Sequence, residues 1–213
     1  MLHFIVCLIV GYFCGCISCG YWMGRFYHMD IRTQGSGNAG TTNVLRTLGK
    51  LPALIVFVGD LAKAVIPIMV VRLVIRPEDW YLWCLYIGLG VVIGHNYPFY
   101  LGFKGGKGIA VTAAVVMSAC HPIMVPIGLG IFIIVVALTR YVSLGSLFVA
   151  WYIPASTLIW YRQTPYFVHA MVISLLFAAF AYFQHRQNIV RLLHGTENKL
   201  WGNDKKDAVN KEA

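Results

Sequence analysis

The feature that most constrains this chain is a series of long apolar runs without charged residues. The first 24 residues, MLHFIVCLIVGYFCGCISCGYWMG, contain no Lys, Arg, Asp or Glu. Only 12% of the 213 residues are charged, about half the share of a typical soluble domain. Because about 20 mostly apolar residues let a helix cross a bilayer, these runs predict an all-α integral membrane protein.

The N-terminal run has two interpretations. A secretory signal peptide would carry basic residues before its apolar core and small residues at a cleavage site. Residues 1–24 have neither, which favours a retained membrane helix. Four of the six cysteines lie in this run, and we interpret them as small apolar packing residues, because no second pair of metal or redox ligands stands nearby. The cysteines are Cys7, Cys14, Cys16, Cys19, Cys84 and Cys120.

Six apolar runs predict membrane spans, and a further segment is ambiguous. Residues 108–120 either form a short span of their own or join the next run as one long helix kinked at Pro122. The His121–Pro122 pair favours a turn, because a residue before proline avoids the α region. The six runs are residues 2–24, 52–74, 80–101, 123–139, 144–161 and 166–184.

The distribution of Lys and Arg decides between six and seven spans. With seven spans, thirteen of the seventeen Lys and Arg residues fall on one face, and only Arg72, Arg76 and Arg162 on the other. Because cytoplasmic loops are enriched in Lys and Arg, we expect a bundle of seven transmembrane helices with the N-terminus outside and the C-terminus in the cytoplasm. This bias also accounts for the net charge of +9 without a nucleic-acid partner.

We expect one membrane-embedded domain over residues 1–200. Residues 201–213 would be a polar cytoplasmic tail, for which disorder is one expectation. Asp60 and Lys63 lie one helical turn apart inside the second span and can pair. An intramembrane ion pair is a functional hypothesis by default, and a structural pair near the cytoplasmic end is the alternative.

The predicted topology brings three polar segments to the cytoplasmic face. The first, residues 35–46, opens with GSGNAGTTN, which contains G-x-G-x-x-G. A dinucleotide fingerprint needs a preceding strand and a βαβ unit, whereas a membrane helix precedes this segment. The glycines can still let backbone N–H groups form an anion-binding nest, over which Arg46 can close. A polar turn between helices is the alternative.

The second segment, residues 94–108, reads GHNYPFYLGFKGGKG. It is not a Walker P-loop, because Leu101 stands where the first glycine belongs and Gly108 replaces Ser or Thr. Two lysines that straddle two glycines at a helix start nevertheless suit a phosphate. Snorkelling lysines at a membrane boundary are the alternative. We interpret His95 as a hydrogen-bonding cap in preference to a base or a metal ligand.

The third segment, residues 185–197, turns polar after the last apolar run. His185, Asn188 and Arg191 follow one face of a helix, and Arg and Asn can hold anionic oxygens. A juxtamembrane helix that binds anionic lipid is the alternative. The chain contains no H-x-x-x-x-D dyad, no G-x-S-x-G elbow and no zinc pattern. We therefore expect no metal and no cofactor, and little demand for a protein nucleophile.

These three segments resemble the bacterial acyl-phosphate-dependent glycerol-3-phosphate acyltransferase family (PlsY family). That family carries GSGN-x-G-[AT]-TN with an Arg three residues on, then GH-x-x-P-x-F-x-x-FKGGKG, then H-x-x-NI-x-RL-x-x-G-x-E. Here they read GSGNAGTTNVLR, GHNYPFYLGFKGGKG and HRQNIVRLLHGTE. The departures are Thr41, Tyr100 and Gln184, and none removes a residue that we expect to be functional.

The resemblance implies a seven-helix enzyme of the cell inner membrane with its active site facing the cytoplasm. It would transfer a fatty acyl group from acyl phosphate to the 1-hydroxyl of sn-glycerol 3-phosphate, giving lysophosphatidic acid and phosphate, with the donor's phosphate accepting the proton. This is the first acylation of bacterial phospholipid synthesis. Two rivals remain: a membrane transporter of small phosphorylated anions, and a lipid-binding scaffold, which would need none of the three segments.

The resemblance and the residue types together give the expected site. We expect Lys104 to hold phosphate, so that Lys104→Ala abolishes turnover with the fold intact, and Lys107 to add charge from further away. His185 would orient a substrate. The expected catalytic residues are Ser36, Arg46, Lys104, His185 and Asn188. The expected phosphate-binding residues are Gly37, Asn38, Gly40, Thr41, Asn43, Gly105, Gly106, Lys107, Ser143 and Arg191.

Overall fold

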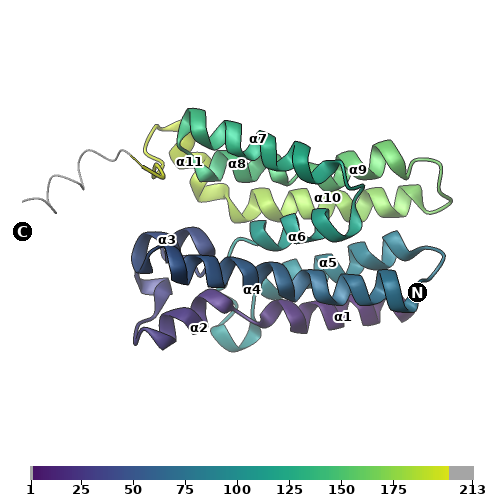
Figure 1. Cartoon of the computed structure of the whole chain (residues 1–213), viewed down its shortest axis with the longest axis horizontal. Helices are drawn as coiled ribbons and strands as arrows, with labels where there is room; N and C mark the ends of the chain where they lie inside the picture. Colours follow the sequence, from purple (N-terminus) through teal and green to yellow (C-terminus); the bar gives the residue numbers. More distant parts are fainter. Residues whose placement is uncertain (1, 202–213) are drawn as a thin grey trace, which may run out of the picture.

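The computed structural model describes residues 2–201, and every regular element within them is a helix (Figure 1). Residues 202–213, most of the predicted tail, lie outside the described part of the chain. The elements are α1 (Leu2–Cys16), α2 (Cys19–Phe26), η1 (Ile31–Thr33), α3 (Thr41–Leu48), α4 (Lys50–Met69), η2 (Val70–Ile75), α5 (Trp80–Asn96), η3 (Phe99–Leu101), α6 (Ile109–Ala119), α7 (Met124–Thr139), α8 (Val142–Val149), α9 (Tyr152–Trp160), α10 (Phe167–Gln184) and α11 (Arg186–Leu193).

Four helical stretches in this part of the chain are long and apolar enough to cross a membrane. Three of them combine two consecutive elements: α1 with α2, α4 with η2, and α8 with α9. α10 is the fourth. They correspond to four of the predicted spans, while α5, α6 and α7 are shorter. The four stretches are Leu2–Phe26, Lys50–Ile75, Val142–Trp160 and Phe167–Gln184.

The ambiguous segment at residues 108–120 forms a helix of its own. α6 ends at Ala119, and α7 begins at Met124. His121 and Pro122 lie between them in a turn. The proline therefore separates two helices, as the restriction on its preceding residue favours, and the alternative of one long kinked helix is wrong.

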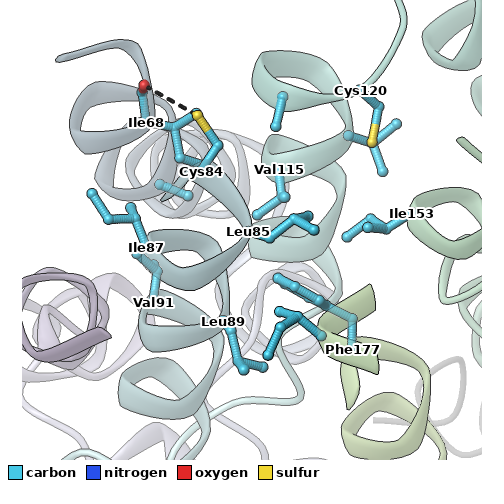
Figure 2. Close-up of a cluster of buried hydrophobic side chains, with 14 of the residues drawn as sticks. Ile68, Cys84, Leu85, Ile87, Leu89, Val91, Val115, Cys120, Ile153 and Phe177 are labelled. Carbon is cyan, nitrogen blue, oxygen red and sulfur yellow. Dashed lines mark hydrogen bonds between the residues drawn. The ribbon is translucent and has the colours of Figure 1, made fainter. Parts of the chain in front are cut away.

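α5 is the central helix of the bundle. Thirteen of its 17 residues are buried, and it packs against α1, α4, α6 and α10 (Figure 2). It also reaches α9, where the Tyr81 hydroxyl lies 2.8 Å from Thr157 Oγ1. Cys84 and Cys120 are buried in this apolar core, and all six cysteines are free. Cys7, from the N-terminal run, is buried in the same core, which confirms the interpretation as a packing residue for that position.

Glycines bring α1 and α5 into close contact. A Cβ atom added at Gly11 would lie 2.2 Å from the carbonyl oxygen of Ile87, and one at Gly94 would lie 2.0 Å from that of Tyr12. Small residues on both helices let the backbones approach to a distance that a side chain would prevent. This tight pair fixes the position of the C-terminal end of α5, where the second polar segment begins.

The three polar segments meet at one end of the bundle. In Figure 1, α3 and α11 lie at the same end, opposite the end marked N, and the loop from α5 into α6 also lies there. The backbone N–H of Leu200 donates to the carbonyl of Arg140, 2.8 Å away, and so ties the chain after α11 to the α7–α8 connection. The predicted convergence of the three segments is confirmed.

Candidate functional site

A cavity of about 610 Å³ opens where the three polar segments meet. Its wall combines polar residues of α3, α8 and α11 at this end with apolar residues of α6 and α7 further along the bundle. The wall includes these residues that the sequence predicts for the site: Ser36, Asn38, Gly40, Thr41, Asn43, Arg46, Lys107, Ser143, His185, Asn188 and Arg191.

Asn43 holds the first segment in shape. Its Nδ2 donates to the carbonyls of Ile31 and Gln34, both at 3.0 Å. Its Oδ1 accepts the backbone N–H of Ser36 at 2.8 Å and the Ser36 hydroxyl at 3.1 Å. The amide is therefore fully occupied within the loop, so Asn43 holds Ser36 in place, and its expected role in phosphate binding lacks a free amide hydrogen.

The free donors of the first segment lie at the start of α3. The N–H of Gly37 donates to the Gln34 carbonyl and that of Gly40 to Asn38 Oδ1, both at 2.9 Å, which corrects the expectation that these two N–H groups face a ligand. The first turn of a helix leaves its N–H groups without helical acceptors. Thr41 and Thr42 occupy that turn and line the cavity.

Two buried hydroxyls on the cavity wall have no hydrogen-bond partner among the described residues. They are Thr41 Oγ1 on α3 and Ser143 Oγ on α8. Buried polar groups in native proteins are almost always satisfied. Two unsatisfied hydroxyls that face the same cavity therefore point to a polar ligand between them.

The two glycines of KGGKG close the second segment back onto α5. The N–H of Gly105 donates to the Asn96 carbonyl and that of Gly106 to the His95 carbonyl, both at 3.0 Å. A Cβ at Gly106 would lie 2.0 Å from His95 Nε2. The expectation that these glycines offer N–H groups to a phosphate is therefore wrong, because both donors already have backbone partners.

The two lysines of this segment are placed the opposite way from the prediction, in which Lys104 holds phosphate and Lys107 lies further away. Lys104 is exposed and lies outside the cavity wall, whereas Lys107 lies on it. The Lys107 ammonium donates to Asn188 Oδ1 on α11. Burial lowers the pKa of Lys107 to about 8, against the opposing effect of Glu197, and Arg191 and Arg46 lower it further.

A hydrogen-bonded chain of side chains runs along α11. Asn188 accepts from Lys107 and donates through Nδ2 to Glu197 Oε1 at 2.6 Å. The other carboxylate oxygen of Glu197 accepts from Arg191 Nε at 2.7 Å. Glu197 thus holds the side chains of both Asn188 and Arg191 by hydrogen bonds. Sequence reasoning did not assign it to the site, although it is the final residue of the matched third segment.

His185 stands where α10 meets α11, and its tautomer follows from its neighbours. Nδ1 lies 2.8 Å from the carbonyl of Ala181, and a carbonyl can only accept, so Nδ1 carries the hydrogen. Burial lowers the pKa of His185 to about 4, and the charge of Lys107 contributes to the lowering. A neutral imidazole therefore presents Nε2 as a hydrogen-bond acceptor.

Arg46 completes the cationic end of the cavity. Its Nη2 donates to the carbonyl of Asn198 at 3.4 Å, and partial burial lowers its pKa. With Lys107 and Arg191, it gives the wall three cations, against the carboxylates of Glu197 and Asp60, and Asp60 is already paired with Lys63. This excess of positive charge suits an anionic ligand.

The remainder of the cavity is apolar. Its wall follows one face of α7 from Met124 to Val136, about 18 Å of helix at 1.5 Å per residue. The wall residues Phe57, Met117 and Leu129 are 39%, 50% and 58% exposed. They lie on α4, α6 and α7, so this limb opens sideways on the apolar surface of the bundle.

Comparison with known proteins agrees with this geometry. Residues 5–195 match the family model described as "Glycerol-3-phosphate acyltransferase". The chain belongs to this family. It is therefore an acyltransferase and, with its long apolar helices, a multi-pass membrane protein.

Relatives of the family align over nearly the whole chain. The glycerol-3-phosphate acyltransferase of Thermoanaerobacter pseudethanolicus is 40% identical over 200 residues, covering 93% of this chain and 96% of the relative. That of Clostridioides difficile is 40% identical over 203 residues, covering 94% and 97%.

A solved structure of the family shares the fold. The crystal structure of PlsY (YgiH), an integral membrane glycerol 3-phosphate acyltransferase in its glycerol 3-phosphate form, superposes with a TM-score of 0.80 at 31% identity, covering 95% of this chain and 97% of that chain. The lysophosphatidic acid form superposes with a TM-score of 0.76.

Proposed function

We propose that this acyltransferase moves a fatty acyl group from acyl phosphate to the 1-hydroxyl of sn-glycerol 3-phosphate, and that the products are lysophosphatidic acid and inorganic phosphate. The observation that carries the proposal is a single cavity whose cationic end is continuous with an apolar limb open to the side of the bundle. Such a cavity suits one polar phosphorylated substrate and one substrate with a lipid tail.

The cationic end suits the phosphate groups of both substrates. Lys107, Arg46 and Arg191 supply charge, and Ser36, Thr41 and Ser143 supply hydroxyls around the same space. Charge-assisted hydrogen bonds to phosphate oxygens are the strongest that such groups make. Ser36 and Arg46, from the first segment, and Asn188, from the third, remain in the proposed catalytic set.

The apolar limb suits the acyl chain of the donor. A lipid-soluble donor can enter from the bilayer between α4 and α7, where Phe57 and Leu129 are exposed beside the cavity. Its acyl chain would lie along the α6 and α7 walls. The phosphate of the donor would then stand at the cationic end, next to the acceptor.

The chemistry needs positioning more than a protein nucleophile. An oxygen–carbon bond forms between the 1-hydroxyl and the acyl carbonyl, and the bond from that carbon to the phosphate oxygen breaks. With a pKa of about 4, His185 is a weak base. We therefore assign it the role of accepting a hydrogen bond from the hydroxyl through Nε2, while the departing phosphate takes the proton.

The proposed topology follows the charge bias. Seven helical segments would cross the membrane: α1 with α2, α4 with η2, α5, α6, α7, α8 with α9, and α10. The end that carries the three polar segments would face the cytoplasm. The enzyme would work in the cell inner membrane, where it would catalyse the first acylation of phospholipid synthesis.

A transporter of small phosphorylated anions fits the cavity less well. Transport needs polar groups along the path across the membrane, whereas the cavity wall beyond Ile109 on α6 and along α7 is apolar. The polar residues are confined to one end. This arrangement suits a reaction at the membrane surface.

The proposal is tested by comparing donors. Purified protein in liposomes is given glycerol 3-phosphate with either acyl phosphate or acyl-CoA, and lysophosphatidic acid and phosphate are measured. We expect product from acyl phosphate alone, with one phosphate released per ester formed. Turnover of acyl-CoA alone would overturn the donor assignment. Movement of glycerol 3-phosphate into sealed vesicles without a covalent product would support the transporter.

A further inference from the structure

Three buried ionisable side chains meet beside the cationic end of the cavity, and two of them, Asp60 and His95, are part of its wall. The proposed reaction does not use them directly. Lys63 and Asp60 come from α4, and His95 from α5. Lys63 Nζ lies 2.8 Å from Asp60 Oδ1, 2.8 Å from His95 Nδ1 and 2.7 Å from the carbonyl oxygen of Ile17. Their exposed fractions are 7%, 1% and 4%.

The predicted Asp60–Lys63 pair is confirmed, but it extends to a third residue. An ammonium group has three N–H donors and no acceptor. Lys63 donates to the Ile17 carbonyl and to the His95 ring, and its ammonium forms an ion pair with Asp60. Nδ1 of His95 must therefore accept, and the ring hydrogen is on Nε2. His95 is not the helix cap that the sequence suggested.

The His95 ring and backbone together hold the glycines of the second segment. Nε2 stands against Gly106, where an added Cβ would come within 2.0 Å of it. The carbonyl of His95 accepts the N–H of Gly106, and the carbonyl of Asn96 accepts that of Gly105. Lys107 follows directly in the chain and lies on the cavity wall. The position of Lys107 thus depends on how His95 is seated.

We propose that Lys63 is a positioning residue for the acyl transfer. Its contact with His95 holds the ring between α4 and the KGGKG loop, and the loop in turn places Lys107 on the cavity wall. The Asp60 carboxylate pairs with the Lys63 ammonium inside the bundle. The inference rests on the proposed function, since it is read through that activity.

Stability alone is a weak reason to keep such a cluster. A buried ion pair costs desolvation, and well-packed apolar residues of similar volume are often as stable. The cluster joins the break between α1 and α2 at Ile17 to α4 and α5, and from α5 it reaches the loop that delivers Lys107. A fixed geometry at this point, and not added stability, is what the contacts provide.

The test is a double-mutant cycle between Lys63→Met and Lys107→Ala, measured as kcat/KM in liposomes. We expect Lys63→Met to lower kcat/KM about tenfold in the wild-type background and less than about twofold in the Lys107→Ala background, because a residue that acts through Lys107 has little left to act on. Equal factors in both backgrounds would overturn the inference, since a general loss of folded protein multiplies every activity.

Arg72→Met is the matched control. Arg72 lies in η2, at the opposite end of the same helical stretch, and its Nη1 donates to the carbonyl of Ser118 at 2.7 Å. It resembles Lys63 as a cation that binds a backbone carbonyl, but it does not touch the cavity. We expect unchanged kcat/KM in Arg72→Met. A tenfold loss there would show that any cation removed from this stretch has the same effect, and would count against the inference.

His95→Asn serves if Lys63→Met does not fold. The Asn side chain keeps an acceptor near the Lys63 ammonium but withdraws the ring from Gly106, and its cycle with Lys107→Ala is read by the same criterion. Acyl transfer by the wild type and by Arg72→Met shows that the proposed function stands. If the substitution then lowers kcat/KM by the same factor in the wild-type and Lys107→Ala backgrounds, only the role of Lys63 is rejected. A wild-type protein that shows no acyl transfer rejects the proposed function.

Discussion

The first and second polar segments are both rich in glycine, yet they contribute to the cavity in different ways. In the first, Thr41 and Thr42 place the free N–H groups of a helix start and an unpartnered hydroxyl on the cavity wall. In the second, the backbone N–H groups of Gly105 and Gly106 already donate to carbonyls at the end of α5. Of residues 94–108, His95, Lys107 and Gly108 reach the wall.

A glycine-rich motif can therefore serve a ligand in two ways. The first segment offers its own polar groups to the ligand. The second uses glycine because no side chain fits between the loop and His95, and the result is the placement of one cation. Substitutions in the two segments should therefore affect different quantities.

The largest expected effect separates the two lysines of the second segment. Lys107→Ala should lower kcat/KM roughly 100-fold, because a half-buried cation on the cavity wall that stabilises developing charge is lost. Lys104→Ala, with an exposed side chain outside the cavity, should stay within about threefold of the wild type. The measurement is steady-state acyl transfer by both variants at equal folded concentration. A severe loss in Lys104→Ala with a mild one in Lys107→Ala would reverse the comparison.

The next effect comes from the close contact beneath the loop. Gly106→Ala should lower kcat/KM more than about tenfold, because its Cβ would lie 2.0 Å from His95 Nε2 and must displace the loop and Lys107 with it. Gly130→Ala on α7 is the control, since an added Cβ there meets no atom within 4 Å. Equal activities of the two variants would show that the contact does not set the site.

A smaller effect is expected for a single unpartnered hydroxyl. Ser143→Ala should lower kcat/KM roughly tenfold, the effect of losing one hydrogen bond to a charged ligand. Ser146→Ala is the matched control one turn further along α8, because the Ser146 hydroxyl already donates to the Val142 carbonyl at 2.8 Å. If both variants lose activity equally, Ser143 contributes through packing and not through a ligand contact.

The smallest effect is a pH dependence that belongs to Lys107. With a pKa of about 8, the side chain is charged below pH 8 and loses its charge as the pH rises through that value. At pH 8, kcat/KM should fall about twofold from its value at pH 7, where substrate phosphate is already ionised. Lys107→Arg should remove this alkaline limb, because guanidinium stays charged. If Lys107→Arg shows the same fall in kcat/KM between pH 7 and pH 8, a group other than Lys107 causes the pH dependence.

The sequence predicted much of the fold because its signals are local. Apolar runs, Pro122 and the charge bias predicted the helices, the turn after α6 and the convergence of three segments at one end. The face of His185, Asn188 and Arg191 was also predicted, because it follows from helical periodicity alone. All three side chains line the cavity.

The rest depended on contacts that periodicity does not carry. KGGKG gives no sign of which lysine is buried, because that is decided by the hydrogen bonds of Gly105 and Gly106 to α5. The link from Asp60 and Lys63 to His95 joins residues about 30 positions apart. The apolar limb on α7 looked like any other membrane-facing helix, since its cavity face and its lipid face have similar residues.

The most direct test of the central claim is a structure of this protein with glycerol 3-phosphate bound. We expect a phosphate inside the cavity, within hydrogen-bonding distance of Lys107 Nζ and of the hydroxyls of Thr41 and Ser143. A phosphate held outside the cavity at Lys104, with both hydroxyls still without partners, would contradict it.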